Sequence, residues 1–455
     1  MTGLIWFRRD LRLDDNPAWS AATSNHDALI ALFVIDPLLW EGSGTHRRVQ
    51  LRAHLEALDK ALAEQGGRLK VRRGRPVDVV AEEAGPAAAI YWNDDYSPYA
   101  TKRDEAVAAT VDIPVHRFHG NAVHSPAEIF TDSGTPYRVF TPYYKRWTAE
   151  PWSPPESPDP ARIGDDPGEG LPAIEGDPLL APGEDAAFAR LEDFLDRIDE
   201  YDEQRNRPDL DRTSRLSADL KFGTLGPRRI IETAGDASKG RRAFVRQLCW
   251  RDFYAQIMFH SPHTAVRAMR PEYDRVAWRD DSEGFAAWQA GATGYPIVDA
   301  GMRQLQAEGW MHNRVRMIAA SFLVKDLLID WRRGERHFRD VLVDADLAQN
   351  VGNWQWVAGT GADAAPYFRV FNPIAQGRKF DPNGDYVRRY VPELAGLDTR
   401  YLHAPWEAGP LDLAAAGIDL GGTYPEPIID HAFARERVLA AYQEAREHPE
   451  RDAAP

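Results

Sequence analysis

The chain of 455 residues has a formal net charge of −15 and one cysteine, Cys249. This length predicts about two to four domains, and a single cysteine excludes an intrachain disulfide or a cysteine-rich zinc site. No apolar run approaches the roughly 18 residues that cross a bilayer. Arg8 and Arg9 follow the first apolar run, which is the reverse of a secretory signal. We therefore expect a cytoplasmic chain without a membrane partner.

The first 125 residues alternate between two kinds of pattern. Strands are predicted at short apolar or β-branched runs, namely Leu4–Phe7, Leu29–Asp36, Leu69–Arg72, Ala88–Trp92 and Val115–Phe118. Between them lie helical patterns such as Arg47–Gln65. This alternation predicts a parallel sheet with helices on both faces. No G-x-G-x-x-G motif follows the first strand, so we expect no ordinary dinucleotide site there.

The middle of the chain changes in composition. Residues 150–185 are rich in Pro, Gly, Asp and Glu, which is typical of a linker that wraps the surface. From Asp185 onward the patterns are mostly helical, as at Ala187–Tyr201, Arg241–His260, Ile297–Glu308, His312–Leu328 and Glu335–Leu342. We predict an α/β domain at residues 1–130, a linker at 131–185 and an all-helical domain at 186–445.

Hydroxyl side chains crowd the segment Thr213–Gly223 just before a helical run. Hydroxyls and free N–H groups at a helix start suit a phosphate. Ordinary N-capping of the helix explains the same pattern.

A second polar segment, Gly309–Met317, places Arg316 and Met317 three and four residues after Asn313, so that they can share one helix face. An inward-facing Arg316 needs a carboxylate partner, for which the segment Asp344-Ala345-Asp346 is the candidate. His312 has no partner histidine at ligand spacing, and we predict no metal site.

Several of the 14 tryptophans lie in the helical region, among them Trp278, Trp331, Trp354 and Trp356. Packing is the usual role of such rings, and the alternative is a relay of oxidisable rings that feeds electrons to a buried cofactor. The chain has no G-x-S-x-G motif and no P-loop. Any redox-active group must therefore be a bound cofactor.

Together these motifs resemble the DNA photolyase/cryptochrome family. The resemblance runs nearly end to end, through Trp6–Asn16, Thr213–Gly223, Trp250–Tyr254, Thr293–Ala300, Gly309–Met317, Asp330–Glu335 and Asn350–Asn372. It implies an α/β antenna domain, a long connector and a helical flavin domain. It also implies light-driven repair of cyclobutane pyrimidine dimers in UV-damaged DNA, most like the class I enzymes, by a chain that we expect to be a monomer.

The resemblance implies that FAD binds in the helical domain. By position, the phosphates and ribityl chain would meet Tyr201, Thr213, Ser214, Arg215, Leu216 and Ser217. Arg316 and Asp344 would pair beside the flavin ring, with Ala345 next to them and Asp346 on the polar edge of the ring. Asn350 would face the flavin N5; Asn there resembles repair enzymes, whereas plant cryptochromes carry Asp and insect cryptochromes Cys.

Position in the family also suggests roles in electron transfer and in DNA binding. Trp354, Trp331 and Trp278 match an electron-hopping triad, ordered from the flavin to the surface. The flipped-out dimer would lie between Trp250 and Trp356, with Asn313 and Met317 against its bases and Arg205, Arg314 and Arg369 on the flanking phosphates. A net charge of −15 does not exclude such a local basic face.

One residue departs from the pattern. Dimer photolyases carry Glu at the position of Gln247, and a charged hydrogen bond is worth about 1.5–3 kcal/mol against about 1 kcal/mol for a neutral one. We therefore expect weaker dimer binding or slower repair. Gln also occurs there in (6-4) photolyases and animal cryptochromes, so a (6-4) photolyase and a cryptochrome-like blue-light photoreceptor are alternatives, as is a photolyase for single strands. Against (6-4) repair, the Asn313–Met317 region lacks the expected His pair and has only His312 beside it.

The segment Tyr91–Tyr99 resembles the branch whose antenna is an 8-hydroxy-deazaflavin. Position-matched candidates for this pocket are Phe33, Asp36, Arg48 and Asp95. The Asn-Glu pair of the folate-binding branch would fall at Tyr99-Ala100, which disfavours folate. FMN and an empty pocket are the alternatives.

Overall fold

The computed structural model describes residues 1–155 and 158–447; Glu156 and Ser157 of the predicted linker, and residues 448–455, lie outside this range. The chain folds into two compact units. The first comprises residues 1–202, 214–262 and 343–349, and the second comprises 203–213, 263–342 and the residues from 350 onward. The domain boundaries expected near residues 130 and 185 stay a prediction.

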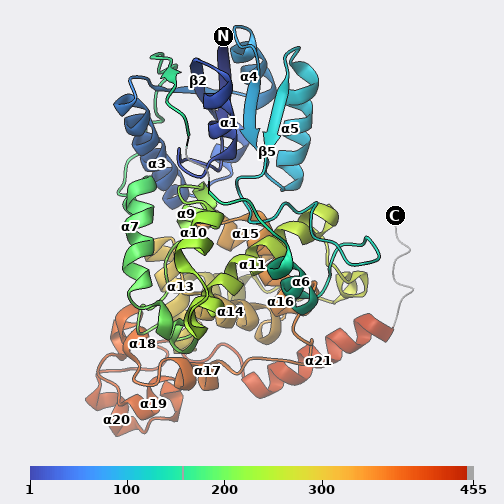
Figure 1. Ribbon diagram of the computed structural model, residues 1–455. Helices are drawn as coiled ribbons and strands as arrows, with labels where there is room; N and C mark the ends of the chain where they lie inside the picture. The colour runs from blue at the N-terminus through green and yellow to red at the C-terminus, as the bar shows by residue number, and fades with distance from the viewer. Residues whose placement is uncertain (156–157, 448–455) are drawn as a thin grey trace. The chain divides into compact units, whose positions relative to one another are not determined.

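A parallel sheet organises the N-terminal part of the first unit (Figure 1). Its strands are β1 (Thr2–Phe7), β2 (Ala28–Ile35), β3 (Leu69–Arg73), β4 (Ile90–Asn93) and β5 (Val115–Phe118), in the order β3-β2-β1-β4-β5. The two-residue β6 (Arg162–Ile163) pairs with the start of β2. The predicted strands and their parallel arrangement are confirmed.

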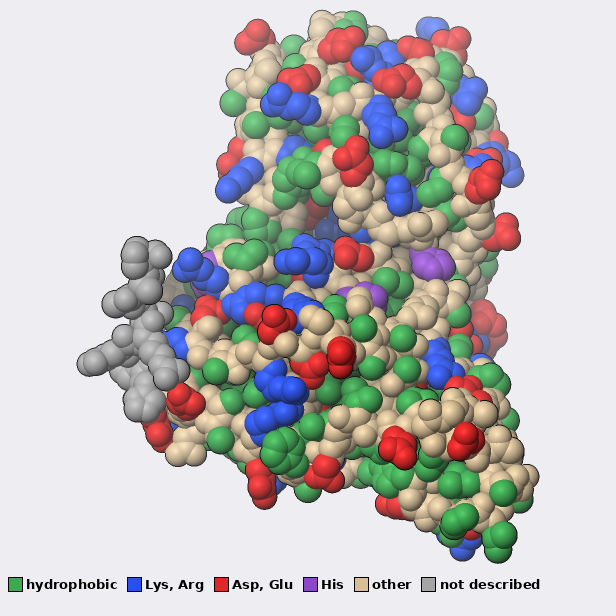
Figure 2. Space-filling model, turned by 180° about the vertical axis from the view of Figure 1, so that it is seen from behind, with side chains coloured by type: hydrophobic (Ala, Val, Ile, Leu, Met, Phe, Trp, Pro, Cys, Tyr) green, Lys and Arg blue, Asp and Glu red, His purple; other side chains and the backbone are tan. Residues whose placement is uncertain are grey.

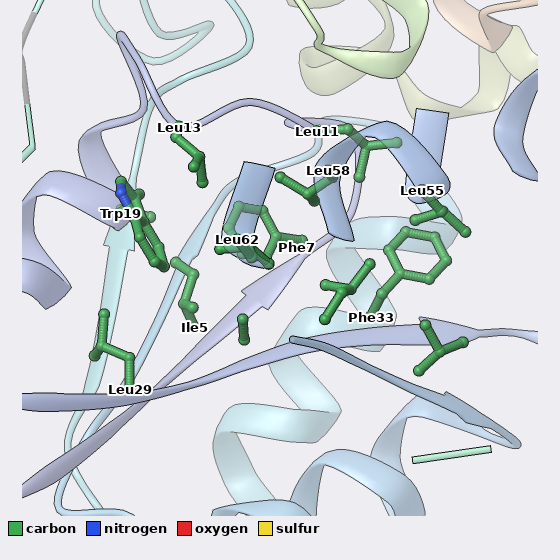
Figure 3. Packing of buried hydrophobic residues seen from close by; sticks show 14 of the residues in the cluster. Ile5, Phe7, Leu11, Leu13, Trp19, Leu29, Phe33, Leu55, Leu58 and Leu62 are labelled. Carbon is green, nitrogen blue, oxygen red and sulfur yellow. The ribbon is translucent and has the colours of Figure 1, made fainter. Parts of the chain in front are cut away.

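Alternating side chains of β1 build a core on each face of the sheet. Ile5 and Phe7 point to one face, where they pack with α1 (Pro17–Asn25) and α3 (Thr45–Glu64). Figure 3 shows Leu55, Leu58 and Leu62 of α3 closing over this layer. Leu4 and Trp6 point to the other face, toward α4 (Pro76–Ala84) and α5 (Pro98–Thr110). The expectation of helices on both faces is thereby confirmed.

The segment predicted as a linker carries regular structure. Helix α6 (Phe140–Ala149) buries Phe140, Tyr143 and Trp147, and β6 buries Ile163. The predicted linker range of 131–185 therefore contains one well-packed helix, which ends just before the stretch rich in Pro, Gly and acidic residues.

The rest of the chain is helical. The bounds from the end of the linker to residue 290 are α7 (Glu184–Leu195), η1 (Ile198–Glu200), α8 (Tyr201–Gln204), α9 (Ser217–Phe222), α10 (Pro227–Ala234), α11 (Lys239–His260), η2 (Pro262–Ala265), η3 (Pro271–Arg275) and α12 (Ser282–Ala290); a further short helix in the N-terminal part is α2 (Pro37–Glu41). Those that follow are α13 (Pro296–Glu308), α14 (Asn313–Ser321), η4 (Phe322–Asp326), α15 (Trp331–Val341), α16 (Leu347–Ala358), α17 (Pro373–Phe380), α18 (Asp385–Tyr390), η5 (Pro392–Leu394), α19 (Thr399–Leu402), η6 (Pro405–Glu407), α20 (Pro410–Ala415) and α21 (His431–Glu447).

One predicted helix, His312–Leu328, is interrupted. Helix α14 ends at Ser321 and the chain continues as a π-helical turn, η4. Lys325 of this turn is buried, and its ammonium donates to the carbonyls of Ala358 (2.8 Å) and Tyr367 (3.2 Å) and lies 4.0 Å from the ring centre of Tyr442 in α21. Burial lowers the pKa of Lys325 to about 7. The π-turn thus meets partners that are distant in the sequence, which local spacing cannot reveal.

Candidate functional site

The hydroxyl-rich segment before α9 does not serve as a helix cap. Leu216 is the N-cap residue of α9, and no side chain makes a cap hydrogen bond there. The Thr213 hydroxyl is buried and has no hydrogen-bond partner within the part of the chain that the structure describes. Arg215 adopts a left-handed backbone (φ 53°). An orphaned buried hydroxyl and an uncapped helix start fit a phosphate or a polyol chain, so these residues are compatible with the predicted FAD site.

Tyr201, another predicted FAD residue, lies in the apolar cluster of the first unit. Its ring meets Phe194 and Phe244 edge to face, with centroids 5.6 Å apart in both cases. The ring is therefore fixed by α7 and α11, and only 9% of the residue is exposed.

A largely buried carboxylate lies in the segment Asp344-Ala345-Asp346. Asp346 forms an ion pair with Arg9, which follows β1, and accepts a hydrogen bond from the Gln349 amide (3.0 Å). Arg9 also pairs with Asp95 (3.1 Å) and donates to the Lys221 carbonyl (3.2 Å). The side chain of Asp346 is only 11% exposed.

Three cations surround this carboxylate. Burial alone would raise the pKa of Asp346, but the charges of Arg9, Lys221 and Arg251 outweigh it and hold the pKa well below its usual range. Burial, together with the charges of Arg9 and Arg47, outweighs the nearby carboxylates and lowers the pKa of Lys221 to about 7. Asp346 therefore stays ionised at every physiological pH.

Sequence reasoning missed these cations as site residues. Arg9 lies in the motif Trp6–Asn16 and Lys221 in the motif Thr213–Gly223, but nothing in either local sequence indicates that the two side chains come close together. Gly223 makes the approach feasible, because it ends α9 with φ 71° and a Cβ there would lie 1.9 Å from the Arg9 carbonyl oxygen.

Helix α14 arranges its polar residues as their spacing predicts. The Asn313 amide lies 3.8 Å from the Met317 sulfur, so both occupy one helix face. His312 is the N-cap, with Nδ1 accepting from the Arg314 amide (3.1 Å), which is a structural role. Arg316 donates from Nε to the Met311 carbonyl (2.8 Å).

The three predicted phosphate contacts influence one another. Arg314 donates to the Asn206 side-chain oxygen (2.8 Å), and its guanidinium lies 4.4 Å from the ring centre of Phe380. Burial, together with the charges of Arg205 and Arg369, lowers the pKa of Arg314 to about 10. Cations that repel one another suit a polyanion. Figure 2 shows Lys and Arg side chains interspersed with acidic ones on the face that it draws.

Asn350 has a fixed orientation. Its amide nitrogen donates to both the backbone carbonyl and the side-chain carboxylate of Glu335, each at 2.9 Å. Burial raises the pKa of Glu335. The amide is therefore held by α15 within the second unit.

The three relay candidates sit in separate environments of the second unit. Trp354 is 2% exposed and packs against Phe338 (centroids 5.0 Å apart) and Trp288 (6.2 Å). Trp331 is buried at the start of α15. Trp278 is half-buried, and its ring meets Tyr442 edge to face at 6.0 Å. A Cβ on Gly334 would lie 2.2 Å from the Trp354 ring, so this glycine admits the indole against α15.

The predicted walls of the lesion site lie on different elements. Trp250 is half-buried on α11 in the first unit, and Trp356 is half-buried on α16 in the second. Gln247 stands one turn before Trp250, where its amide nitrogen donates to the Ala243 carbonyl (3.0 Å).

The antenna candidates surround the carboxyl ends of the strands. Asp36 caps α2 by accepting from the Leu38 amide (3.0 Å) and also accepts from the Tyr99 hydroxyl. Arg48 lies 5.8 Å from the Trp40 ring centre, and its buried Nε has no hydrogen-bond partner among the described residues. Phe33 belongs to the core of the sheet, while Asp95 pairs with Arg9. Carboxyl ends of parallel strands are the usual place for a ligand.

No helix in the described part of the chain has both the length and the apolar character to cross a membrane. Residues 1–155 and 158–447 also contain no group of His, Cys, Asp and Glu side chains that could hold a metal ion. The expectations of a monomer and of a cytoplasmic location stay predictions.

Two family models match the chain. Residues 3–161 match the DNA photolyase model, and residues 244–444 match the FAD-binding domain of DNA photolyase. Among curated proteins, the chain is 42% identical to the deoxyribodipyrimidine photo-lyase of Agrobacterium fabrum, over 96% of this chain and 97% of that protein. It is 40% identical to the enzyme of the same name from Escherichia coli, over 98% of this chain and 99% of that protein.

Solved structures agree with these matches. A class III photolyase from Agrobacterium tumefaciens superposes with a TM-score of 0.93 at 40% identity, covering 98% of each chain. A photolyase from Sulfolobus tokodaii, described with two FAD molecules, has a TM-score of 0.87 at 34% identity over 98% of this chain and 100% of that one. A cryptochrome from Synechocystis has a TM-score of 0.90 at 29% identity over 97% and 99%.

The Asp346 cluster generates a stability prediction. Asp346→Asn removes the charge that three cations share, so we expect the free energy of unfolding to fall by about 3–5 kcal/mol at pH 7. Because the folded-state pKa of Asp346 is depressed, its contribution is complete above the ordinary carboxyl pKa of about 3.9 and is lost as the pH falls through the lower folded-state value. Urea unfolding should therefore show that the free energy of unfolding falls less between pH 7 and pH 3 in the variant than in the wild type.

The exposed Asp132 provides the control, since Asp132→Asn should change the free energy of unfolding by less than about 0.5 kcal/mol. Equal stability of Asp346→Asn and the wild type at pH 7 would contradict the role given to this carboxylate.

Proposed function

The chain belongs to the DNA photolyase family, and from this premise we propose that it is a deoxyribodipyrimidine photo-lyase that splits cyclobutane pyrimidine dimers in UV-damaged DNA under light. Near full-length similarity to enzymes of that name carries the proposal. Assignment to class I stays a prediction, because one solved relative is described as class III.

FAD would be held by Tyr201 and the segment Thr213–Ser217, with Arg316, Asp344, Ala345, Asp346 and Asn350 around its ring. Bound and reduced, FAD supplies the electron that light transfers to the dimer. The chain would orient the cofactor and the dimer and would exclude water from the space between them. Two hydrogen bonds to Glu335 fix the orientation of Asn350. Its amide does not ionise near neutral pH, so Asn350 would not transfer a proton to the flavin. This supports repair over signalling.

DNA would dock through local charge. Arg314 stays protonated at neutral pH, because its pKa of about 10 is still well above 7. With Arg205 and Arg369 it offers positive charge to the backbone phosphates. Trp250 and Trp356 would receive the extruded dimer as flat apolar walls, and Asn313 and Met317 would contact its bases from one face of α14.

Lesion choice tests this proposal. Reduced protein is illuminated with near-UV light in a mixture of three duplexes that carry a thymine dimer, a (6-4) product or no lesion. We expect only the dimer to disappear, as measured by chromatography of the digested DNA. Loss of the (6-4) product instead would overturn the proposal, and a strong preference for dimers in single strands would restrict it to that substrate.

Gln247 gives a second prediction. The Gln247 amide donates to its own helix at Ala243, which a carboxylate cannot do. Gln247→Glu therefore frees the side chain and supplies a charged acceptor to the dimer. We expect the Kd for dimer-containing duplex to fall about 3- to 10-fold, since charged hydrogen bonds exceed neutral ones by about 1 kcal/mol. Binding to undamaged duplex is the control; tighter binding to both DNAs, or to neither, would contradict this role.

The proposed electron relay gives a third prediction. Trp354 is the predicted ring nearest the flavin, and Phe is harder to oxidise than Trp. Trp354→Phe should therefore abolish light-driven reduction of bound, oxidised FAD by added thiol, followed by absorbance. Repair by protein reduced beforehand should stay within about twofold of wild type. The matched control is Trp288→Phe at the neighbouring indole, which should retain photoreduction; normal photoreduction in Trp354→Phe would remove it from the relay.

For the antenna we propose 8-hydroxy-deazaflavin at Phe33, Asp36, Arg48 and Asp95. The unpartnered Arg48 Nε and the nearby Lys221 favour an anionic chromophore. Because the pKa of Lys221 is about 7, it is charged below pH 7 and neutral above, so binding of the ionised chromophore should weaken as the pH rises through 7. Titration by fluorescence between pH 6.5 and 8.5 measures this, with Lys221→Gln expected to flatten the trend. FMN, second-site FAD or folate binding in its place would contradict the assignment.

A further inference from the structure

Trp250, the tryptophan proposed to face the lesion, has an aromatic partner that precedes the predicted helical domain in the sequence. The indole of Trp250 stacks face to face on the ring of Phe140, with centroids 3.6 Å apart and planes inclined by only 6°. Phe140 is the first residue of α6, which lies in the range 131–185 predicted to be a linker. The stack therefore joins that segment to α11.

Phe140 is itself immobilised. It is 1% exposed, with Phe253 against it edge to face at 5.6 Å and Tyr144 stacked on it at 5.8 Å. The guanidinium of Arg246 caps the pair, 5.3 Å from the Phe140 ring centre and 5.2 Å from that of Tyr144. A ring packed on all these sides is a rigid backing.

The other aromatic neighbours of Trp250 do not lie flat on it. Phe253 meets the indole by its edge at 5.5 Å and 88°, and Tyr254 is tilted by 34° at 5.5 Å. Trp250 is only half-buried. Among the described residues, Phe140 is thus the ring that lies flat on the partly exposed indole.

We propose that Phe140 is a positioning residue of the lesion site: it backs Trp250 so that the indole presents its opposite face, at a fixed angle, to the extruded dimer. The inference rests on the proposed function and on the role given there to Trp250. Stacking of a base on an aromatic ring is worth about 1–3 kcal/mol, as measured by alanine substitution. A preorganised ring delivers more of it, because less side-chain freedom is lost on binding.

The experiment compares the FAD-loaded full chain with Phe140→Leu. We expect its Kd for a thymine-dimer duplex to rise about 5-fold, the scale of one lost aromatic stack, with binding to undamaged duplex unchanged. In repair assays KM should rise by a similar factor while kcat stays within about twofold, since Phe140 does not touch the reacting atoms. Phe140→Tyr keeps the stacked ring and should restore both values.

The matched control is Phe253→Leu. This ring is fully buried, touches both Phe140 and Trp250, and loses the same volume, but it meets them through its edge. The Kd of Phe253→Leu for the dimer duplex should stay within about twofold of wild type, although this variant should lose as much stability to urea as Phe140→Leu, or more. In a Trp250→Leu background, Phe140→Leu should weaken dimer binding no further, because there is no indole left to position.

Different failures are distinguishable. If Trp250→Leu weakens dimer binding but Phe140→Leu behaves like Phe253→Leu, the inference is overturned and the proposed function stands. If Trp250→Leu leaves dimer binding unchanged, the role of Trp250 is overturned and the inference with it. Should Phe140→Leu not load FAD, Phe140→Met carries the same test, since a thioether fills the space without a flat face.

Discussion

A carboxylate that is largely withdrawn from water ties the first unit together. A buried charge is tolerated only among partners, and Asp346 finds them in Arg9 after β1, Lys221 in α9 and Arg251 in α11. Segments more than 300 residues apart in sequence thereby meet. Neighbouring Asp344 and Ala345 are positioned with it, so the polar edge proposed for the flavin depends on this one charge. The same cluster contains Asp95, which links the proposed FAD and antenna sites through a single arginine.

Local patterns predict the fold well where the determining forces are local. Alternation in β1 is sufficient to place Ile5 and Trp6 on opposite faces, because period two is a property of the strand itself. Local patterns fail where the partners of a residue lie far away in the sequence. The π-turn after Ser321 depends on contacts of Lys325 with α21, and the helix that starts at Phe140 packs its aromatic rings against the distant α11. For the site, residue types and motif order identify candidates such as Asn350, but the bonds to Glu335 that fix it come only from the fold.

Under the proposed function, the chain would recognise its substrate through a local cluster of positive charge, which the overall charge of −15 does not reveal. Arg205, Arg314 and Arg369 concentrate positive potential at one place. In the proposed site, a rigid aromatic face on Trp250 would compensate in part for the absence of a carboxylate at Gln247, since stacking needs no charge. We therefore expect a neutral amide at this position to permit dimer repair at lower affinity.

Turnover on a thymine dimer tests this account most directly. FAD in the purified protein is reduced, an excess of duplex DNA with a single thymine dimer is added, and restored thymine is quantified after near-UV illumination and in the dark. The account predicts many thymine pairs restored per protein molecule in the light and none in the dark. Absence of restored thymine, in protein whose FAD is bound and photoreduced normally, would contradict it and favour a (6-4) enzyme or a photoreceptor.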